Sequence, residues 1–327
     1  MSEKKKETVC AVVVTYNRKN LLIECLSAIR KQTRPVDAIY IIDNASTDET
    51  PELLLEKGYI KELPPKNLTE PWEKTFEVKN LTDGKPIKLH YVRMHENTGG
   101  AGGFHEGVKR AYERRYDWLW LMDDDGLPKE DCLDQILLAS LEFSLDAIQP
   151  VVISKEDKNR LAFLIYDVET KTEKFTFLEA KEKAVYMNYA TLFNGILIKR
   201  EVIKKTGPPK KELFIWGDEV EYLLRLKRNK IRIATVTNAV FVHPMTRMKS
   251  FNFLGKIKFV FQNDKFKDYC FYRNRTYIHK IYNRKKLGLY FLKYIFYFLF
   301  RFNYSNLILF LKAFKDGLLE DWGKEKS

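Results

Sequence analysis

The stretch Trp118–Pro128, WLWLMDDDGLP, is the most informative part of the sequence about the fold. Five apolar residues in a row are typical of a buried strand, and three aspartates follow at once. If the extended geometry continues, Asp123 and Asp125 share one face while Asp124 points away. Two carboxylates on one face at a strand end indicate a site for Mg²⁺ or Mn²⁺, and a solvated acidic turn is the alternative explanation.

The residues before this stretch alternate between short apolar runs and amphipathic segments, the pattern of strands separated by helices. The expected strands cover residues 11–15, 38–42, 88–93 and 118–122. The expected helices follow a cap at Asn17, a capping box at Ser46–Glu49 and a start near Phe104, with a proline-interrupted insert at about residues 59–87. This order implies right-handed βαβ units, so the predicted fold class is α/β with a mostly parallel, Rossmann-like sheet.

Polar side chains stand at the carboxyl ends of all four strands, which is where ligands bind in such sheets. They are Thr15, Tyr16, Asn17 and Arg18 after the first strand, Asp43 and Asn44 after the second, Asn97 after the third, and Asp123, Asp124 and Asp125 after the fourth. Four strand ends that carry polar groups to one edge predict a single ligand site there.

A glycine-rich loop, NTGGAGG at residues 97–103, follows the third strand. Its main-chain N–H groups are suited to bind phosphate, because glycine permits close approach of the backbone. It is not a dinucleotide fingerprint, since His105 stands where the third glycine is needed, and no GK[ST] of a Walker loop follows. A structural turn and a sugar-phosphate contact both remain open.

Two further features carry acids or a histidine. The segment WGDEVEY at residues 216–222 places three acids at the start of an expected helix, either as partners of the helix dipole or as a base that deprotonates a sugar hydroxyl. The run 239–242 reads as a strand ending at His243. That imidazole is structural unless it faces the aspartates, where it completes a metal shell.

Charge is concentrated near the C-terminus. The chain has 327 residues and a formal net charge of +13. Between Lys265 and Arg301 there are ten Lys and Arg against one acid, Asp268, interleaved with thirteen Phe and Tyr. This composition suits an anionic membrane surface. A helical cap that packs its rings on the main domain, or a nucleic-acid-binding surface, has the same composition.

Cysteine usage and hydropathy bear on the compartment. The four cysteines are far apart and form no CxxC pair, which argues against a disulfide framework and favours a reducing compartment. The first residues show no apolar leader, and no run of 18 residues lacks a charge. A cytoplasm-facing protein is the expectation.

Taken together, these motifs resemble the inverting glycosyltransferases of family 2, which have the GT-A fold. The resemblance covers about residues 8–250 and rests on VVVTYNR (12–18), IIDNASTD (41–48), WLWLMDDDGLP (118–128) and WGDEVEY (216–222). Within that family, NTGGAGGF (97–104) with WGDEVEY and a strand-end histidine is most similar to the galactofuranosyltransferases. Rhamnosyltransferases share the layout but usually have a different glycine loop.

The resemblance implies a role for each matching residue. Nucleotide contacts fall on Thr15, Tyr16, Arg18, Asp43, Asn97 and Asp124, with Asp43 near the base. Contacts with the donor sugar or the acceptor fall on Gly100, Gly102, Gly103 and Trp216. The metal ligands are Asp123, Asp125 and His243. The catalytic base falls on Glu219, where many relatives carry Asp, and Asp218 is the reserve.

The resemblance also implies the reaction: a single displacement, assisted by Mn²⁺ or Mg²⁺, that moves galactofuranose from its UDP ester to a glycan or polyprenyl-linked glycan. A rhamnosyltransferase that uses dTDP-rhamnose is the runner-up. A sugar nucleotidyltransferase and a non-enzymatic basic nucleic-acid-binding protein are the remaining alternatives. Residues 1–250 would form the catalytic domain and residues 251–327 a helical region bound to the inner membrane face, with no nucleic-acid partner.

Overall fold

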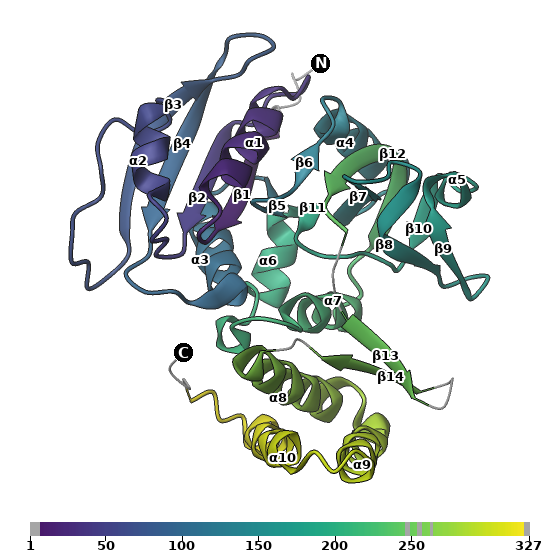
Figure 1. The fold of residues 1–327 in the computed structure, drawn as a ribbon. Helices are drawn as coiled ribbons and strands as arrows, with labels where there is room; N and C mark the ends of the chain where they lie inside the picture. Colours follow the sequence, from purple (N-terminus) through teal and green to yellow (C-terminus); the bar gives the residue numbers. More distant parts are fainter. Residues whose placement is uncertain (1–6, 246–248, 254–256, 262–263, 324–327) are drawn as a thin grey trace.

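The computed structural model describes residues 7–245, 249–253, 257–261 and 264–323 (Figure 1). At its centre lies a mixed sheet in the order β10-β12-β7-β11-β5-β1-β2-β4-β3. Four parallel strands form one half: β1 (Val9–Thr15), β2 (Ala38–Asp43), β4 (Pro86–Arg93) and β5 (Trp118–Asp123). The expected α/β class is confirmed, and all four predicted strands are present.

The other half of the sheet departs from the parallel pattern. Strand β11 (Asn194–Lys199) pairs antiparallel with β5 and with β7 (Ala147–Ser154), and β12 (Ile233–His243) pairs parallel with β7. The remaining strands are β3 (Trp72–Lys79), β6 (Leu127–Pro128), β8 (Arg160–Asp167), β9 (Thr172–Thr176), β10 (Val185–Met187), β13 (Lys249–Phe253) and β14 (Ile257–Phe261). The expected 59–87 insert thus contributes β3, an edge strand antiparallel to β4.

Helices cover both faces of the sheet, because β1 sends alternate side chains into two separate apolar layers. Val9, Ala11 and Val13 pack with α1 (Lys19–Arg30), α2 (Thr50–Glu56) and α4 (Cys132–Glu142). Cys10, Val12 and Val14 pack with α3 (Gly99–Glu113), α6 (Arg200–Thr206) and α7 (Asp218–Arg228). A short α5 (Phe177–Ala180) follows β9.

Two predicted helix caps are wrong. Asn17 has a left-handed φ of 53°, and its Oδ1 accepts the Thr47 N–H instead of capping α1. The Ser46–Glu49 capping box does not form, because the Asp48 carboxylate accepts the Lys19 N–H at 3.0 Å and so caps α1 from the neighbouring loop. Helix α2 therefore begins only at Thr50. The two strand-end loops are tied to each other rather than to their own helices.

The expected glycine loop is largely helix, since α3 begins at Gly99 rather than near Phe104. The reason is close packing. A Cβ on Gly103 would lie 2.5 Å from Val14 Cγ1, and one on Gly107 would lie 2.4 Å from Val12 Cγ1. The glycines let α3 rest directly on β1, and the first turn of this helix comes to the carboxyl edge of the sheet.

The C-terminal helices are α8 (Lys265–Tyr282), α9 (Arg284–Phe300) and α10 (Tyr304–Leu319). They form a separate aromatic cluster, and α8 lies against α7 below the sheet (Figure 1). Across the parts of the chain that the structure describes, no helix combines the length and the apolar character that crossing a bilayer requires.

Candidate active site

The aspartate triplet spans the end of β5, because Asp123 is the last residue of the strand and Asp124 and Asp125 lie in the turn that follows. Asp124 Oδ2 accepts the Thr15 hydroxyl at 2.7 Å. The Arg18 guanidinium lies 3.2 Å from Asp124 Oδ1 and 2.8 Å from Asp125 Oδ2. The structure therefore brings together Thr15, Arg18 and the aspartates from the ends of neighbouring strands β1 and β5.

His243, at the end of β12, joins the same group from the other half of the sheet. Its Nε2 lies 3.1 Å from Asp125 Oδ1, and its Nδ1 donates to the Pro244 carbonyl at 2.6 Å. Burial works against the charged imidazole, but the Asp125 carboxylate outweighs it and raises the pKa of His243. In its neutral form, an imidazole held through Nδ1–H presents the Nε2 lone pair, the arrangement found in metal-binding histidines.

Negative charge is in excess here. Burial, with Asp125 and Asp124 nearby, raises the pKa of Asp123 well above its usual range. Burial also raises the pKa of Asp124 to about 6, although Arg18 opposes the shift. The pKa of Asp125 is lowered, since its contacts with His243 and Arg18 outweigh the effect of burial.

These residues fit a divalent cation by chemistry. Asp123, Asp125 and His243 supply hard oxygen and imidazole donors, and a cation would relieve the repulsion among the carboxylates. Within the described residues, no three His, Cys, Asp or Glu side chains are arranged so that they could hold a metal ion, and Asp125 and His243 pair with each other instead.

The acids at the start of α7 form a second cluster of carboxyl side chains. Asp218 is buried, and burial together with the adjacent Glu219 raises its pKa well above the usual range. Asp218 hydrogen-bonds Glu219, and Asp123 is close enough to add to the shift. A side chain with so high a pKa holds its proton and donates to Glu219, whose Oε2 also accepts the Gly217 N–H at 3.1 Å. Asp218 thus lies within electrostatic range of Asp123, and Glu219 accepts the hydrogen bond from Asp218.

The turn before α7 is strained. Phe214 has φ 61° and ψ −67°, and the Ile215 N–H donates to Leu213 O at 2.7 Å, which together define a classic γ-turn. Trp216 follows with φ 63° and Gly217 with φ 101°. Non-glycine residues in such conformations cost about 1–3 kcal/mol each and persist where the surroundings impose them. Trp216 Nε1 is buried with no hydrogen-bond partner among the described residues.

On the other side of the site, Asp43 is entirely buried and fully engaged. It accepts Tyr91 Oη at 2.7 Å, Arg93 at 2.6 Å and the Ser46 N–H at 2.9 Å. In this conformation the Asp43 carboxylate positions the Arg93 side chain and the turn at residues 44–46. Arg93 was not singled out in the sequence, although it ends the adjacent strand in register with Asp43.

The start of α3 is held by two asparagines. Asn97 Oδ1 accepts the Gly99 N–H at 2.9 Å. Asn44, one of the polar strand-end residues of the predicted ligand site, binds both the Thr98 N–H and the Gly99 carbonyl. Of the three predicted sugar-site glycines, Gly102 and Gly103 are packed against Thr98 and Val14, whereas a Cβ on Gly100 would meet open space. Tyr16 is exposed beside this edge.

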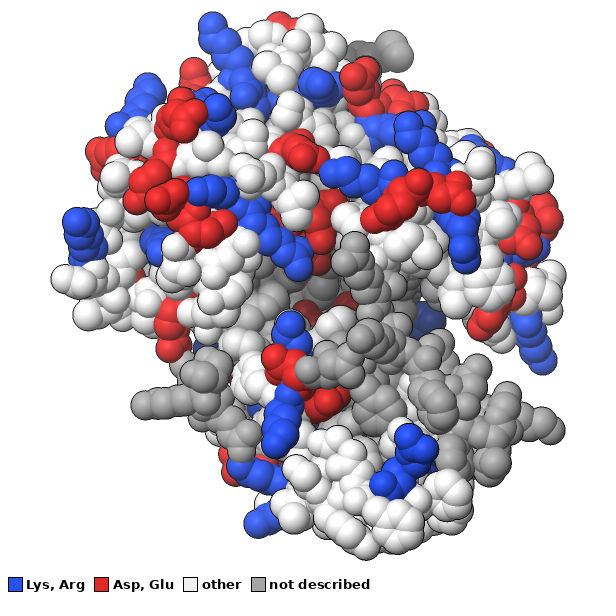
Figure 2. All heavy atoms as spheres, in the orientation of Figure 1, with Lys and Arg blue, Asp and Glu red and all other residues white. Residues whose placement is uncertain are grey.

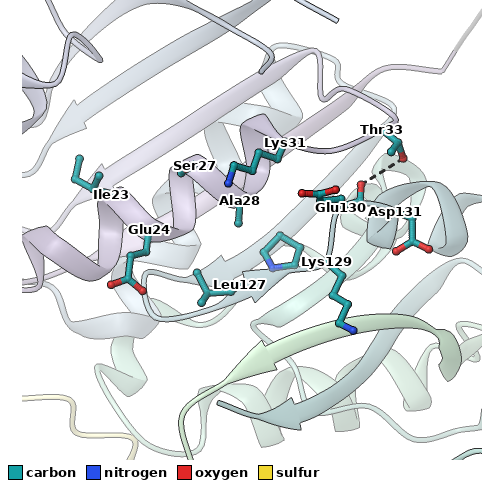
Figure 3. Close-up of a pocket in the computed structure, with 11 residues that line it drawn as sticks. Ile23, Glu24, Ser27, Ala28, Lys31, Thr33, Leu127, Lys129, Glu130 and Asp131 are labelled. Atoms are coloured by element: carbon teal, nitrogen blue, oxygen red, sulfur yellow. Dashed lines mark hydrogen bonds between the residues drawn. The ribbon is translucent and has the colours of Figure 1, made fainter. Parts of the chain in front are cut away.

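A pocket of about 910 Å³ lies elsewhere, between α1 and the segment 127–131 (Figure 3). Ile23, Ser27 and Ala28 line it on the helix side, and Leu127 and Lys129 line it on the other. None of the predicted site residues lines this pocket. It therefore gives no support to the aspartate cluster and is a separate surface feature.

Comparison with known proteins identifies the family. A family model described as "Glycosyltransferase like family 2" matches residues 73–259, and one described as "Glycosyl transferase family 2" matches residues 10–64. The galactofuranosyltransferase GlfT1 of Mycolicibacterium smegmatis is 32% identical over 279 residues, which are 83% of each chain. GlfT1 of Mycobacterium tuberculosis is 31% identical over 275 residues, 83% of this chain and 82% of that one.

Two solved structures share the fold. GalNAc-T7 with UDP, GalNAc and Mn²⁺ has a TM-score of 0.54 at 15% identity, over 85% of this chain and 50% of that one. The mannosyltransferase PcManGT of Pyrobaculum calidifontis with GDP-Man and Mn²⁺ has a TM-score of 0.52 at 17% identity, over 85% and 65% of the two chains. The predicted GT-A fold and the predicted similarity to galactofuranosyltransferases are both confirmed. The chain belongs to glycosyltransferase family 2.

Proposed function

We propose that this glycosyltransferase is an inverting, metal-dependent enzyme that transfers galactofuranose from UDP-galactofuranose to a hydroxyl of a glycan. The observation that carries the proposal is that Arg18 contacts Asp124 and Asp125, and His243 contacts Asp125, at one edge of the sheet. Asp123 lies beside them, and Asp218 is within electrostatic range of Asp123. The donor follows from the GlfT1 relatives, whose name states that activity. dTDP-rhamnose is the alternative donor.

In this proposal each residue acts on a defined part of the reaction. Glu219 takes the proton of the acceptor hydroxyl as that oxygen attacks the anomeric carbon, and protonated Asp218 orients Glu219. Arg18, beside Asp124 and Asp125, offers positive charge to the departing nucleotide. Asp123, Asp125 and His243 would hold Mn²⁺ or Mg²⁺, which neutralises charge on a diphosphate. One displacement inverts the anomeric centre, so no nucleophilic Ser or Cys is required.

The C-terminal helices suggest where the acceptor lies. The exposed apolar side chains of α9, α10 and their connection include Leu289, Leu292, Phe296, Phe300, Phe302, Tyr304 and Ile308. Figure 2 shows mostly uncharged atoms where these helices lie. Exposed Arg284, Lys285, Lys286 and Arg301 flank them. We place residues 1–250 as the catalytic unit and 251–327 as a region that rests on the inner membrane face, where a polyprenyl-linked glycan is the acceptor.

The test is a donor panel. The purified protein is incubated with Mn²⁺, a galactan-type acceptor and each of several UDP-, dTDP- and GDP-sugars, and nucleotide release and the product anomer are followed by NMR. Transfer from UDP-galactofuranose with inversion is expected. Turnover with dTDP-rhamnose alone would replace the donor, and release of pyrophosphate would overturn the assignment.

A further inference from the structure

Helix α8 reaches from the C-terminal region to the strained turn before α7, through two consecutive buried polar residues. Asn274 is fully buried, and its Nδ2 lies 2.7 Å from Leu213 O, 2.9 Å from Ile215 O and 2.7 Å from Trp216 O. Its neighbour Arg273, 3% exposed, donates to Glu212 O and Leu213 O. One face of α8 therefore binds four carbonyl oxygens of the segment 212–216.

The orientation of the Asn274 amide is set by Arg273. Arg273 Nε donates to Asn274 Oδ1 at 3.1 Å, so the amide oxygen is occupied and the NH₂ group faces the turn. The guanidinium lies over the rings of Tyr269 and Trp322, at 5.6 and 5.2 Å. Both residues thus present donors to the turn, and its buried carbonyl oxygens accept hydrogen bonds from them.

The opposite side of the turn rests on the glycine-rich start of α3. The Ala101 N–H donates to Phe214 O at 3.0 Å, and a Cβ on Gly99 would lie 2.1 Å from that oxygen. A Cβ on Gly217 would lie 3.4 Å from Asn274 Cβ, so α8 also approaches the residue directly before the carboxyl pair. The segment 212–217 is held between α3 and α8.

We propose that Asn274, oriented by Arg273, is a positioning residue: it holds the strained turn 213–217 and thereby fixes the direction in which α7 presents Asp218 and Glu219. The inference rests on the proposed role of that pair. It follows from two observations: non-glycine residues persist at positive φ only where contacts impose that conformation, and the three carbonyl oxygens that Asn274 binds flank both Phe214 and Trp216.

The test compares Asn274→Ala and the nearly isosteric Asn274→Asp with Thr276→Val. Thr276 is equally buried on α8, and its hydroxyl donates to Tyr272 O within the helix. Thr276→Val therefore removes a buried side-chain hydrogen bond from the same helix without touching the turn. Hydrogen exchange measured by mass spectrometry on peptides covering 99–104 and 212–222 reports the turn without any need for activity.

Both Asn274 variants are expected to speed exchange at least tenfold in these peptides and not in the sheet. They should lower kcat with the best donor of the panel at least tenfold while the donor KM changes less than threefold. Thr276→Val should do neither. Unchanged exchange in the Asn274 variants, or faster exchange throughout the chain, would overturn the proposal. Faster exchange of the turn with unchanged kcat would overturn the catalytic link, and a wild-type protein inactive with every donor would instead refute the proposed function.

Discussion

At the scale of single residues, the aspartate triplet shows how a turn gives identical neighbouring side chains different contacts. Continued strand geometry would have placed Asp124 away from the site, but the chain turns after Asp123, and Asp124 bonds Thr15 and Arg18 instead. Asp125 is left to face His243. The three carboxylates thus have three environments, and a substitution at each should have its own signature.

The first prediction concerns Asp125. Replacing it with Ala removes one proposed metal ligand and the partner of His243, so turnover should fall at least 100-fold and should not recover at saturating Mn²⁺. Nucleotide release across a Mn²⁺ titration measures this. Asp131→Ala, an exposed acid on the same segment, is the control and should retain normal turnover. Full activity of the Asp125 variant with saturating metal would remove Asp125 from the site.

The second prediction separates the two members of the carboxyl pair. Glu219→Gln should lower kcat by about 10²–10⁴ while UDP still binds, because general-base catalysis contributes a factor of that size. Asp218→Asn keeps a neutral hydrogen-bond donor beside Glu219, so its kcat should fall about tenfold or less. Steady-state kinetics and UDP binding by calorimetry measure both. The reverse order of effects would make Asp218 the base.

The sequence was informative about charged residues at strand ends and silent about residues that act through the main chain. Thr15, Arg18 and the aspartates follow from the rule that parallel strands bring their carboxyl ends to one edge. Asn44 and Asn274 bind main-chain atoms of segments far away in the sequence, and no local pattern marks such a contact. The contact between Arg93 and Asp43 could have been predicted, because it follows from pairing the second and third predicted strands in register.

At the scale of elements, the four parallel strands and the end of β12 were predictable, whereas the helix starts and antiparallel strands such as β3 and β11 were not. A buried apolar run specifies its own strand, whereas a cap depends on which loop lies nearby. Asp48 caps α1 rather than α2 because the loops after β1 and β2 lie side by side. The glycine run was likewise expected to be a loop, because glycine disfavours a helix. Its helical conformation is explained by the close packing of α3 on β1, which the local sequence does not reveal.

That packing gives the third prediction. Alanine favours a helix over glycine by up to about 1 kcal/mol, but a Cβ on Gly103 would lie 2.5 Å from Val14 Cγ1, and overpacking costs about 1–3 kcal/mol. Gly103→Ala should therefore lower the free energy of unfolding in urea by about 1–2 kcal/mol. Gly100→Ala gains the same propensity with no contact within 4 Å and should not destabilise. Equal effects of the two changes would contradict the packing argument.

At the scale of the whole molecule, His90 makes stability depend on pH. It is buried between the Thr75 hydroxyl and Tyr116 Oη, at 2.8 and 3.0 Å. Burial, with Arg114 nearby, lowers its pKa to about 4. Between that value and the unfolded value near 6.5, the unfolded chain binds more protons, so stability falls as pH falls through this window.

The fourth prediction is that unfolding free energy drops by about 1.5 kcal/mol more between pH 7 and pH 5 in the wild type than in His90→Gln, a figure reduced for solvent screening. Urea titrations at the two pH values of both proteins measure the difference. Because other groups titrate equally in both proteins, the comparison isolates His90. Parallel pH profiles would show that the imidazole does not titrate differently on folding.

The last prediction tests the apolar face of α9 and α10. Phe296 and Ile308 are 60% and 68% exposed, and a bilayer surface would cover them while lipid phosphates meet the flanking Lys and Arg. Phe296→Ser with Ile308→Ser should weaken binding to anionic vesicles at least tenfold, since each buried side chain contributes about 1 kcal/mol or more. Vesicle sedimentation at low and high salt measures binding, and salt should weaken that of the wild type. Leu141→Ser with Leu178→Ser, which are 75% and 83% exposed on the α/β part, is the matched control and should bind normally. Equal binding by all three proteins would separate the C-terminal helices from the membrane and leave their rings as a packing surface for the catalytic unit.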